Sequence, residues 1–249
     1  MLADSHCHLD WFKNPAKKVS NASDKGVSRM LSNATGAKSL RKNLALSEKF
    51  SAVHCALGLH PGNALSMSEN ETESSFAFVE KNIAHAAAVG EIGLDFKYAA
   101  SKGQKNLQEN VFRRFISLAA DKNKPVVVHA RYAESRCLDI LEEMGAVKVH
   151  MHWFTNSKKT AARAVSLGFY ISCGPIIFSD SPSAEVVKLI PLENLLLETD
   201  APVAFEGKES EPSWIPRVCG KVAELKGVSF AEVEAATGKN FSLLFKKSL

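Results

Sequence analysis

The sequence predicts an α/β barrel, and three observations lead to this fold class. Short β-branched runs alternate with longer amphipathic segments along the whole chain, a pattern typical of parallel strands joined by helical crossovers. Eight such units fit within 249 residues, the size of a single (β/α)8, or TIM, barrel. No Gly-rich turn follows the first strand, as an open nucleotide-binding sheet would require. We therefore expect one TIM-barrel domain over residues 1–249.

Eight apolar runs are expected to form the barrel strands: Leu2–His6, Val27–Asn33, Val53–Leu59, Ala87–Ile92, Pro125–His129, Val147–Met151, Phe169–Ser172 and Leu195–Glu198. Helical spacing of apolar residues predicts helices over four longer segments: Ser39–Phe50, Asn106–Lys122, Pro212–Lys226 and Ser229–Lys247. Gly238 could interrupt the last of these helices. The polar stretch Ser66–Ser75 reads as a surface loop running into a helix. Phe205–Glu211 is expected to be a loop on the functional side of the barrel.

The composition is that of an ordinary globular protein, with 45% hydrophobic and 23% charged residues. A formal net charge of +4 is too small to indicate nucleic-acid binding by charge alone. The five cysteines form no CxxC pair, which favours free thiols in a reducing cytoplasm. No apolar run is long enough to span a membrane. We infer neither a membrane association nor an obligate protein partner.

Two histidines give the first indication of chemistry. His6 and His8 lie two residues apart at the end of the first strand, so their side chains share one face. Barrel enzymes carry their sites at the C-terminal ends of the strands. Metal-competent side chains recur at later strand ends: Glu91, His129, His152 and Asp200.

Imidazoles with carboxylates and no thiolate suit Zn²⁺, Mn²⁺ or a similar divalent ion that keeps positions open for water. Six ligands are too many for one tetrahedral ion, whereas two ions that share a carboxylate would use them all. Each residue alone has a structural alternative. Glu91 could form a salt bridge and Asp200 could cap a helix, so the interpretation depends on their concurrence.

Six motifs resemble the TatD family of metal-dependent deoxyribonucleases. They are His6-Cys-His8-Leu-Asp10, Gly58-Leu-His60-Pro61, Gly90-Glu-Ile-Gly-Leu-Asp95, Pro125-Val-Val-Val-His129-Ala-Arg131, His152-Trp-Phe154-Thr and Glu198-Thr-Asp200-Ala-Pro202. They occur in the family's order and span most of the chain. The resemblance implies a barrel of the amidohydrolase superfamily, a two-metal centre and hydrolysis of phosphodiester bonds in DNA.

The resemblance also implies a role for each candidate ligand. His6 and His8 would hold one ion, His129 and His152 would hold the second, and Glu91 would bridge both. The ions would be Mg²⁺, Mn²⁺ or Zn²⁺. Where the family usually has His-Cys-Phe, this chain has Trp153 in the middle position.

Asp200 would bind the first ion and accept a proton from the attacking water. Arg131 could donate two parallel hydrogen bonds to a phosphate, or form a salt bridge at the rim. His60 could contact a phosphate or pack in its loop, and Trp153 could stack a base or pack in the barrel. Lys208 is a weaker phosphate candidate.

The leading hypothesis is a 3′–5′ exonuclease acting on single-stranded DNA ends. One alternative is an amidohydrolase-type enzyme that uses the same metal centre on a small ester, amide or nucleotide. A second is a non-enzymatic protein that binds nucleic acid or a partner, which would require a broken ligand set. His150 lies two residues before His152, and we expect it to be a polar residue of the barrel interior rather than a ligand.

Overall fold

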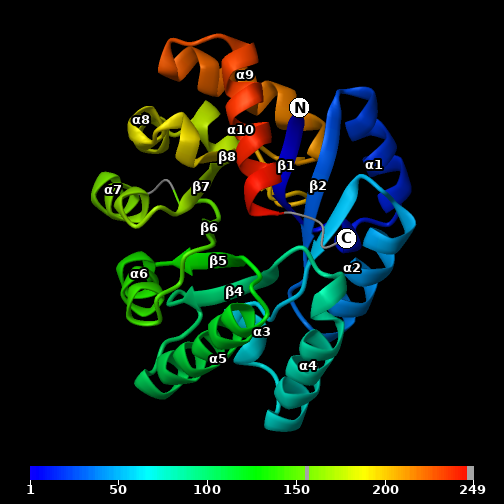
Figure 1. The fold of residues 1–249 in the computed structure, drawn as a ribbon, viewed down its shortest axis with the longest axis vertical. Coiled ribbons are helices and arrows are strands. Elements are labelled where there is room, and N and C mark those ends of the chain that lie inside the picture. The colour runs from blue at the N-terminus through cyan, green and yellow to red at the C-terminus, as the bar shows by residue number, and fades with distance from the viewer. Residues whose placement is uncertain (155–156, 246–249) are drawn as a thin grey trace.

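Eight parallel strands alternate with helices in the computed structural model, which describes residues 1–154 and 157–245 (Figure 1). The strands are β1 (Leu2–Cys7), β2 (Val27–Asn33), β3 (Val53–Ala56), β4 (Val89–Asp95), β5 (Val126–Arg131), β6 (Val149–Met151), β7 (Tyr170–Cys173) and β8 (Leu195–Leu197). All eight expected strands are therefore present. Their ends differ from the expected ones by at most three residues.

The strands follow barrel order and pair in parallel. One ladder joins β1, β2 and β3, and a second joins β4 through β8. Isolated parallel bridges connect the two ladders at both junctions, Cys7 with Ala201 and Ala56 with Ala88. The sequence-based prediction of a parallel (β/α)8 arrangement is confirmed, although isolated pairs rather than continuous ladders span the junctions.

Ten α-helices are present in the described residues. They are α1 (Pro15–Asp24), α2 (Ala37–Lys49), α3 (Pro61–Ala64), α4 (Glu69–Asn82), α5 (Lys102–Asp121), α6 (Glu134–Glu143), α7 (Lys158–Ser166), α8 (Ser181–Leu189), α9 (Ile215–Lys226) and α10 (Phe230–Leu244). Capping boxes at Ser68, Ser101 and Ser229 begin α4, α5 and α10, because each serine and the residue three positions later satisfy two free N–H groups.

The last helix continues through Gly238, contrary to the possible break. A Cβ atom at this position would lie 2.3 Å from the carbonyl oxygen of Met1. The glycine therefore allows the N-terminus to pack closely against α10. The expected end of this helix at Lys247 lies outside the described residues.

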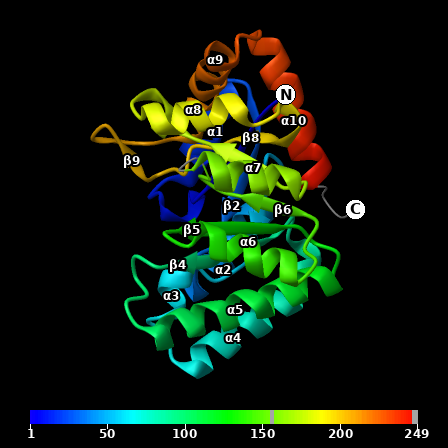
Figure 2. The same cartoon turned by 90° about the vertical axis from the view of Figure 1, so that its left-hand side faces the viewer.

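The segment expected as a loop after the eighth strand contains a short antiparallel hairpin, β9 (Ala204–Phe205) with β10 (Lys208–Glu209). Its two turn residues, Glu206 and Gly207, have φ of 51° and 75°, the left-handed geometry of a tight two-residue hairpin turn. Two-residue strands are too short for alternation to be recognised in the sequence. Figure 2 shows β9 and α3 on one side of the barrel and both termini on the other.

All five cysteines are free and buried, and a cytoplasmic location stays a prediction. No helix in the described part of the chain is sufficiently long and apolar to cross a membrane.

Candidate metal centre

The end of β1 and the segment after β8 bring three candidate ligands together: His6, His8 and Asp200. The backbone N–H of Asp200 donates to the carbonyl of His6 at 2.9 Å, and the N–H of His8 donates to the carbonyl of Ala201 at 2.6 Å. Asp200 has φ of +50°, a conformation that is uncommon outside glycine and that clusters at functional sites. This pairing places its carboxylate against the two imidazoles.

Four ligand atoms form a compact group around the ends of β1, β4 and β8. Nε2 of His6 lies 3.3 Å from Nε2 of His8, and 3.6 Å from both Oε2 of Glu91 and Oδ1 of Asp200. Nε2 of His8 lies 3.6 Å and 3.3 Å from the same two oxygens. A tetrahedron whose corners lie ~2.1 Å from a central Zn²⁺ has edges of about 3.4 Å. The spacing of these atoms therefore fits a divalent ion.

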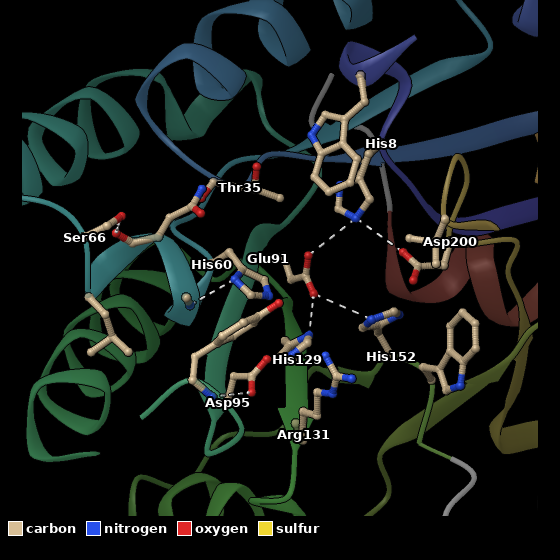
Figure 3. A pocket seen from close by; sticks show the side chains of 18 of the residues that line it. His8, Thr35, His60, Ser66, Glu91, Asp95, His129, Arg131, His152 and Asp200 are labelled. Carbon is tan, nitrogen blue, oxygen red and sulfur yellow. Dashed lines mark hydrogen bonds and ion pairs between the residues drawn. The ribbon is translucent and has the colours of Figure 1, made fainter. Parts of the chain in front are cut away.

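A second group lies on the other side of Glu91. Its Oε1 atom lies 2.9 Å from Nδ1 of His129 and 3.6 Å from Nε2 of His152. One carboxylate oxygen of Glu91 thus faces His6 and His8, and the other faces His129 and His152 (Figure 3). This is the arrangement that a bridging carboxylate requires.

Hydrogen bonds from neighbouring groups fix the orientation of three of these imidazoles. Nδ1 of His8 lies 2.9 Å from the carbonyl oxygen of Asn33. Nδ1 of His152 lies 3.0 Å from Oε2 of Glu198, and Nε2 of His129 lies 3.0 Å from Oδ2 of Asp95. Each ring can donate its N–H to this oxygen and turn its other nitrogen toward the cluster, as metal-ligating histidines usually do.

The electrostatics of the cluster also favour a cation. Burial disfavours charge on His8, but its hydrogen bond with Asp200 and the charge of Glu91 raise its pKa to about 9. Burial likewise lowers the pKa of His129, but Asp95 and Glu91 raise it to about 9. Burial alone would raise the pKa of Glu91, but the surrounding imidazoles have the larger effect and hold this pKa well below its usual value. The charged carboxylates thus attract protons that a divalent ion would replace.

The sequence suggested that Glu91 and His129 end their strands, but both strands continue beyond these residues. Glu91 is the third residue of β4 and His129 is the fourth of β5. The ladder between these strands continues to the pair Asp95 and Arg131. Continued pairing therefore places the two ligands inside the mouth of the barrel.

The cluster opens into a cavity of about 850 Å³ that is lined by three of the expected substrate contacts, His60, Arg131 and Trp153 (Figure 3). Among the described residues, Arg131 forms no ion pair. His60 accepts a hydrogen bond from the N–H of Gly62 at 3.0 Å, which caps α3. Its ring centroid lies 4.4 Å from that of His129. His60 thus both packs in its loop and faces the cavity.

Lys208 does not line this cavity. It lies in β10 and lines a separate hollow beside Trp214 and Arg217. The sequence placed it near the site because it follows the eighth strand, but the hairpin carries it away.

Three buried carboxylates around the cluster were not anticipated as part of the site: Asp4, Asp95 and Glu198. Asp4 accepts hydrogen bonds from the N–H of His6 and from the N–H and hydroxyl of Thr199, so it ties β1 to the end of β8. Glu198 and Asp4 each lie two residues before a candidate ligand, and strand alternation could have found both.

His150 lies in the barrel interior, as expected. Its Nε2 atom is 2.7 Å from the hydroxyl of Ser172, which donates to Oε2 of Glu198 at 2.7 Å. A chain of three buried polar side chains therefore reaches His152.

Glu198→Gln is expected to weaken metal binding without unfolding the protein. The amide keeps the shape of the side chain but loses the charge that orients His152, and such partners typically change metal affinity ~10–100-fold. Calorimetric titration of the metal-free protein with Mn²⁺ should show this loss of affinity. Glu193→Gln, the same change on the exposed surface, is the control, and an unchanged titration of Glu198→Gln would exclude the role.

Cys7→Ser is expected to leave the metal content unchanged. The thiol lies between the two histidines in sequence, but it donates to the carbonyl of Leu31 at 3.4 Å on the side facing β2. The alternation of β1 turns it away from His6 and His8. Elemental analysis after equilibration with Mn²⁺ checks this, and loss of an ion would show that the thiol reaches the cluster.

A parallel barrel whose mouth holds a cluster of imidazoles and carboxylates is typical of metal-dependent hydrolases. The model of the family described as TatD related DNase matches residues 3–246. The chain belongs to this family.

Similar proteins agree with this assignment. The chain is 34% identical over 259 residues to the uncharacterized metal-dependent hydrolase YabD of Bacillus subtilis, with 99% of each chain covered. It is 32% identical over 260 residues to the human deoxyribonuclease TATDN3, covering 99% of this chain and 95% of the relative. The crystal structure of the TatD homologue YjjV from Escherichia coli superposes with a TM-score of 0.89 at 31% identity, covering 98% and 97% of the two chains. The protein is a metal-dependent hydrolase.

Proposed function

We propose that this enzyme hydrolyses phosphodiester bonds in DNA and removes nucleotides from the 3′ ends of single strands, with residues 1–249 acting as one domain. The observation that carries the proposal is the pair of ligand groups that share Glu91 beneath an open cavity. The name of the human relative, a deoxyribonuclease, supports DNA as the substrate.

Six residues would hold two divalent ions, Mg²⁺, Mn²⁺ or Zn²⁺. His6, His8 and Asp200 form one group, His129 and His152 form the other, and Glu91 faces both. The bound ions would supply positive charge to the phosphate oxygens and lower the pKa of the attacking water.

The remaining roles belong to side chains that face the cavity. Asp200 would accept the proton of the attacking water, because its carboxylate borders both the first ligand group and the cavity. Arg131 would donate to the phosphate from the end of β5, where no described carboxylate occupies it. His60 and Trp153, which both line the cavity, would contact the nucleotide. Backbone strain supports a functional role for Trp153, whose φ is +47°.

A comparison of two kinds of substrate tests this proposal. The metal-loaded enzyme should hydrolyse bis(p-nitrophenyl) phosphate faster than p-nitrophenyl acetate or p-nitroacetanilide, since Arg131 and the paired ligand groups suit an anionic phosphoryl centre. EDTA should remove the activity, and Mg²⁺, Mn²⁺ or Zn²⁺ should restore it. Faster turnover of the carboxylic ester or the amide would favour the amidohydrolase alternative.

A further inference from the structure

A second, separate hollow lies beside the β9–β10 hairpin that follows β8. It has a volume of about 430 Å³, within the range of small-ligand sites. Its walls come from the β9–β10 hairpin and from the start of α9, and its lining residues are Phe205, Glu206, Lys208, Trp214 and Arg217. None of them belongs to the two ligand groups.

Barrel enzymes often bind phosphate between the loops that follow the seventh and eighth strands and the start of a short extra helix. The hollow is lined by the segment after the eighth strand and the start of α9, and Phe178 of the segment after the seventh strand contacts its lining. Phe178 ends the 3-10 helix that follows β7, the hairpin follows β8, and the 3-10 helix Pro212–Trp214 precedes α9. Nζ of Lys18 in α1 lies 2.5 Å from Oε1 of Glu211. This ion pair fixes the base of the hairpin.

The hollow is also close to the candidate metal centre along the chain. Val203 lines the larger cavity and Phe205 lines the hollow. These residues are two positions apart in the chain, so their Cα atoms lie no more than ~7 Å apart. This distance is about two steps of a stacked strand, whose rise is ~3.4 Å per nucleotide. A DNA strand whose cleaved bond lies beside Asp200 could therefore place a nucleotide about two steps from that bond in the hollow.

Arg217 gives the strongest indication that the ligand of the hollow carries a phosphate. Its guanidinium carbon lies 4.0 Å from the ring centroid of Phe178, and it is exposed with no ion pair in residues 1–154 and 157–245. Four arginines on the outer helices each pair with a carboxylate: Arg113, Arg114, Arg136 and Arg163. Stacking on an aromatic face leaves the donor edge of a guanidinium free for a phosphate.

The aromatic lining indicates a base beside that phosphate. Phe205 and Trp214 are half-buried, and the ring centroids of Phe205 and Phe178 lie 6.2 Å apart. Glu206 is the one carboxylate in the lining, so with Arg217 and Lys208 the hollow carries a net charge of +1. A phosphate alone would need only the cations, whereas a nucleotide uses both the cations and the rings.

We propose that this hollow is a nucleotide subsite for the DNA strand, which stacks one base on Phe205 and Trp214 and binds its phosphate through Arg217 and Lys208. The proposal rests on the proposed function, because it extends the same substrate beyond the cleaved bond. It predicts that the hollow adds affinity for an oligonucleotide and none for a substrate with a single nucleoside.

Binding without hydrolysis tests the subsite directly. In EDTA, fluorescence anisotropy of a labelled dT12 strand should show Arg217→Ala weakening binding about tenfold and lowering the salt slope of log K by ~0.7, the value for one phosphate contact on a single strand. Phe205→Ala should weaken binding of dT12 about tenfold, the size expected for one stacked base. Its effect on an abasic strand of the same length should stay below about twofold. Arg113→Ala removes a half-buried arginine that pairs with Glu143 and serves as the matched control.

Steady-state kinetics provides a second test of the subsite. With metal restored, Arg217→Ala should raise the KM for dT12 about tenfold relative to Arg113→Ala, and the effect on thymidine 5′-p-nitrophenyl phosphate should be smaller, because that substrate carries a single nucleoside. The subsite would be overturned if Arg217→Ala bound dT12 as tightly as Arg113→Ala does. It would also be overturned if Phe205→Ala lost as much affinity for the abasic strand as for dT12. Absence of hydrolysis by the unmodified enzyme would instead overturn the proposed function, and the two failures are therefore distinguishable.

Discussion

Asp200→Asn should reduce the turnover of bis(p-nitrophenyl) phosphate by about 10²–10⁴-fold while the protein stays folded, because this is the contribution of a positioned general base. The amide keeps the size of the side chain, and the backbone bond from residue 200 to His6 is unaffected. The amide cannot accept a proton from water at neutral pH. Steady-state kinetics with saturating Mn²⁺, together with elemental analysis and thermal unfolding, checks this.

The control for this variant is Asp121→Asn, the same substitution at the exposed end of α5. It should retain the full rate. Turnover by Asp200→Asn within about threefold of the control would show that another group accepts the proton. Loss of turnover together with a collapsed unfolding transition would show a structural role instead.

Glu91→Gln should lower the occupancy of both metal sites at once. Its two oxygens face two ligand groups, at 3.6 Å from His6 and His8 and at 2.9 Å from His129. The amide retains one oxygen, and its NH₂ group cannot ligate. It also removes the negative charge that lies between four imidazoles. Elemental analysis after equilibration with Mn²⁺ should give less than one ion per chain.

Glu224→Gln on the exposed face of α9 is the matched control and should bind two ions. Two ions bound by Glu91→Gln would contradict a bridging role for this carboxylate. Loss of one ion with the other retained would assign Glu91 to a single site.

The sequence predicted the order of the eight strands because parallel barrel strands are nearly continuous apolar runs. It predicted their ends less well, since a ladder extends as far as its neighbour allows. β4 and β5 pair as far as Asp95 and Arg131, and this pairing depends on residues ~36 positions apart in the chain. Patterns within one strand do not contain that information.

The candidate ligands were predictable because strand ends converge in a barrel. Their supporting residues were partly predictable. Glu198 lies two residues before Asp200 and shares its face, whereas the carbonyl of Asn33 that orients His8 has no signature in the side-chain sequence. Lys208 lines the smaller hollow rather than the cavity beside the ligand groups, because proximity in the chain does not define which side of a hairpin a side chain occupies.

The most direct test of metal-dependent DNA hydrolysis is a gel assay with a 5′-end-labelled single strand, run with EDTA and with Mg²⁺, Mn²⁺ or Zn²⁺ restored. The proposed function predicts a ladder of labelled products that shorten from the 3′ end, present only with metal and absent in Asp200→Asn. Intact DNA after incubation with folded, metal-loaded enzyme would contradict it.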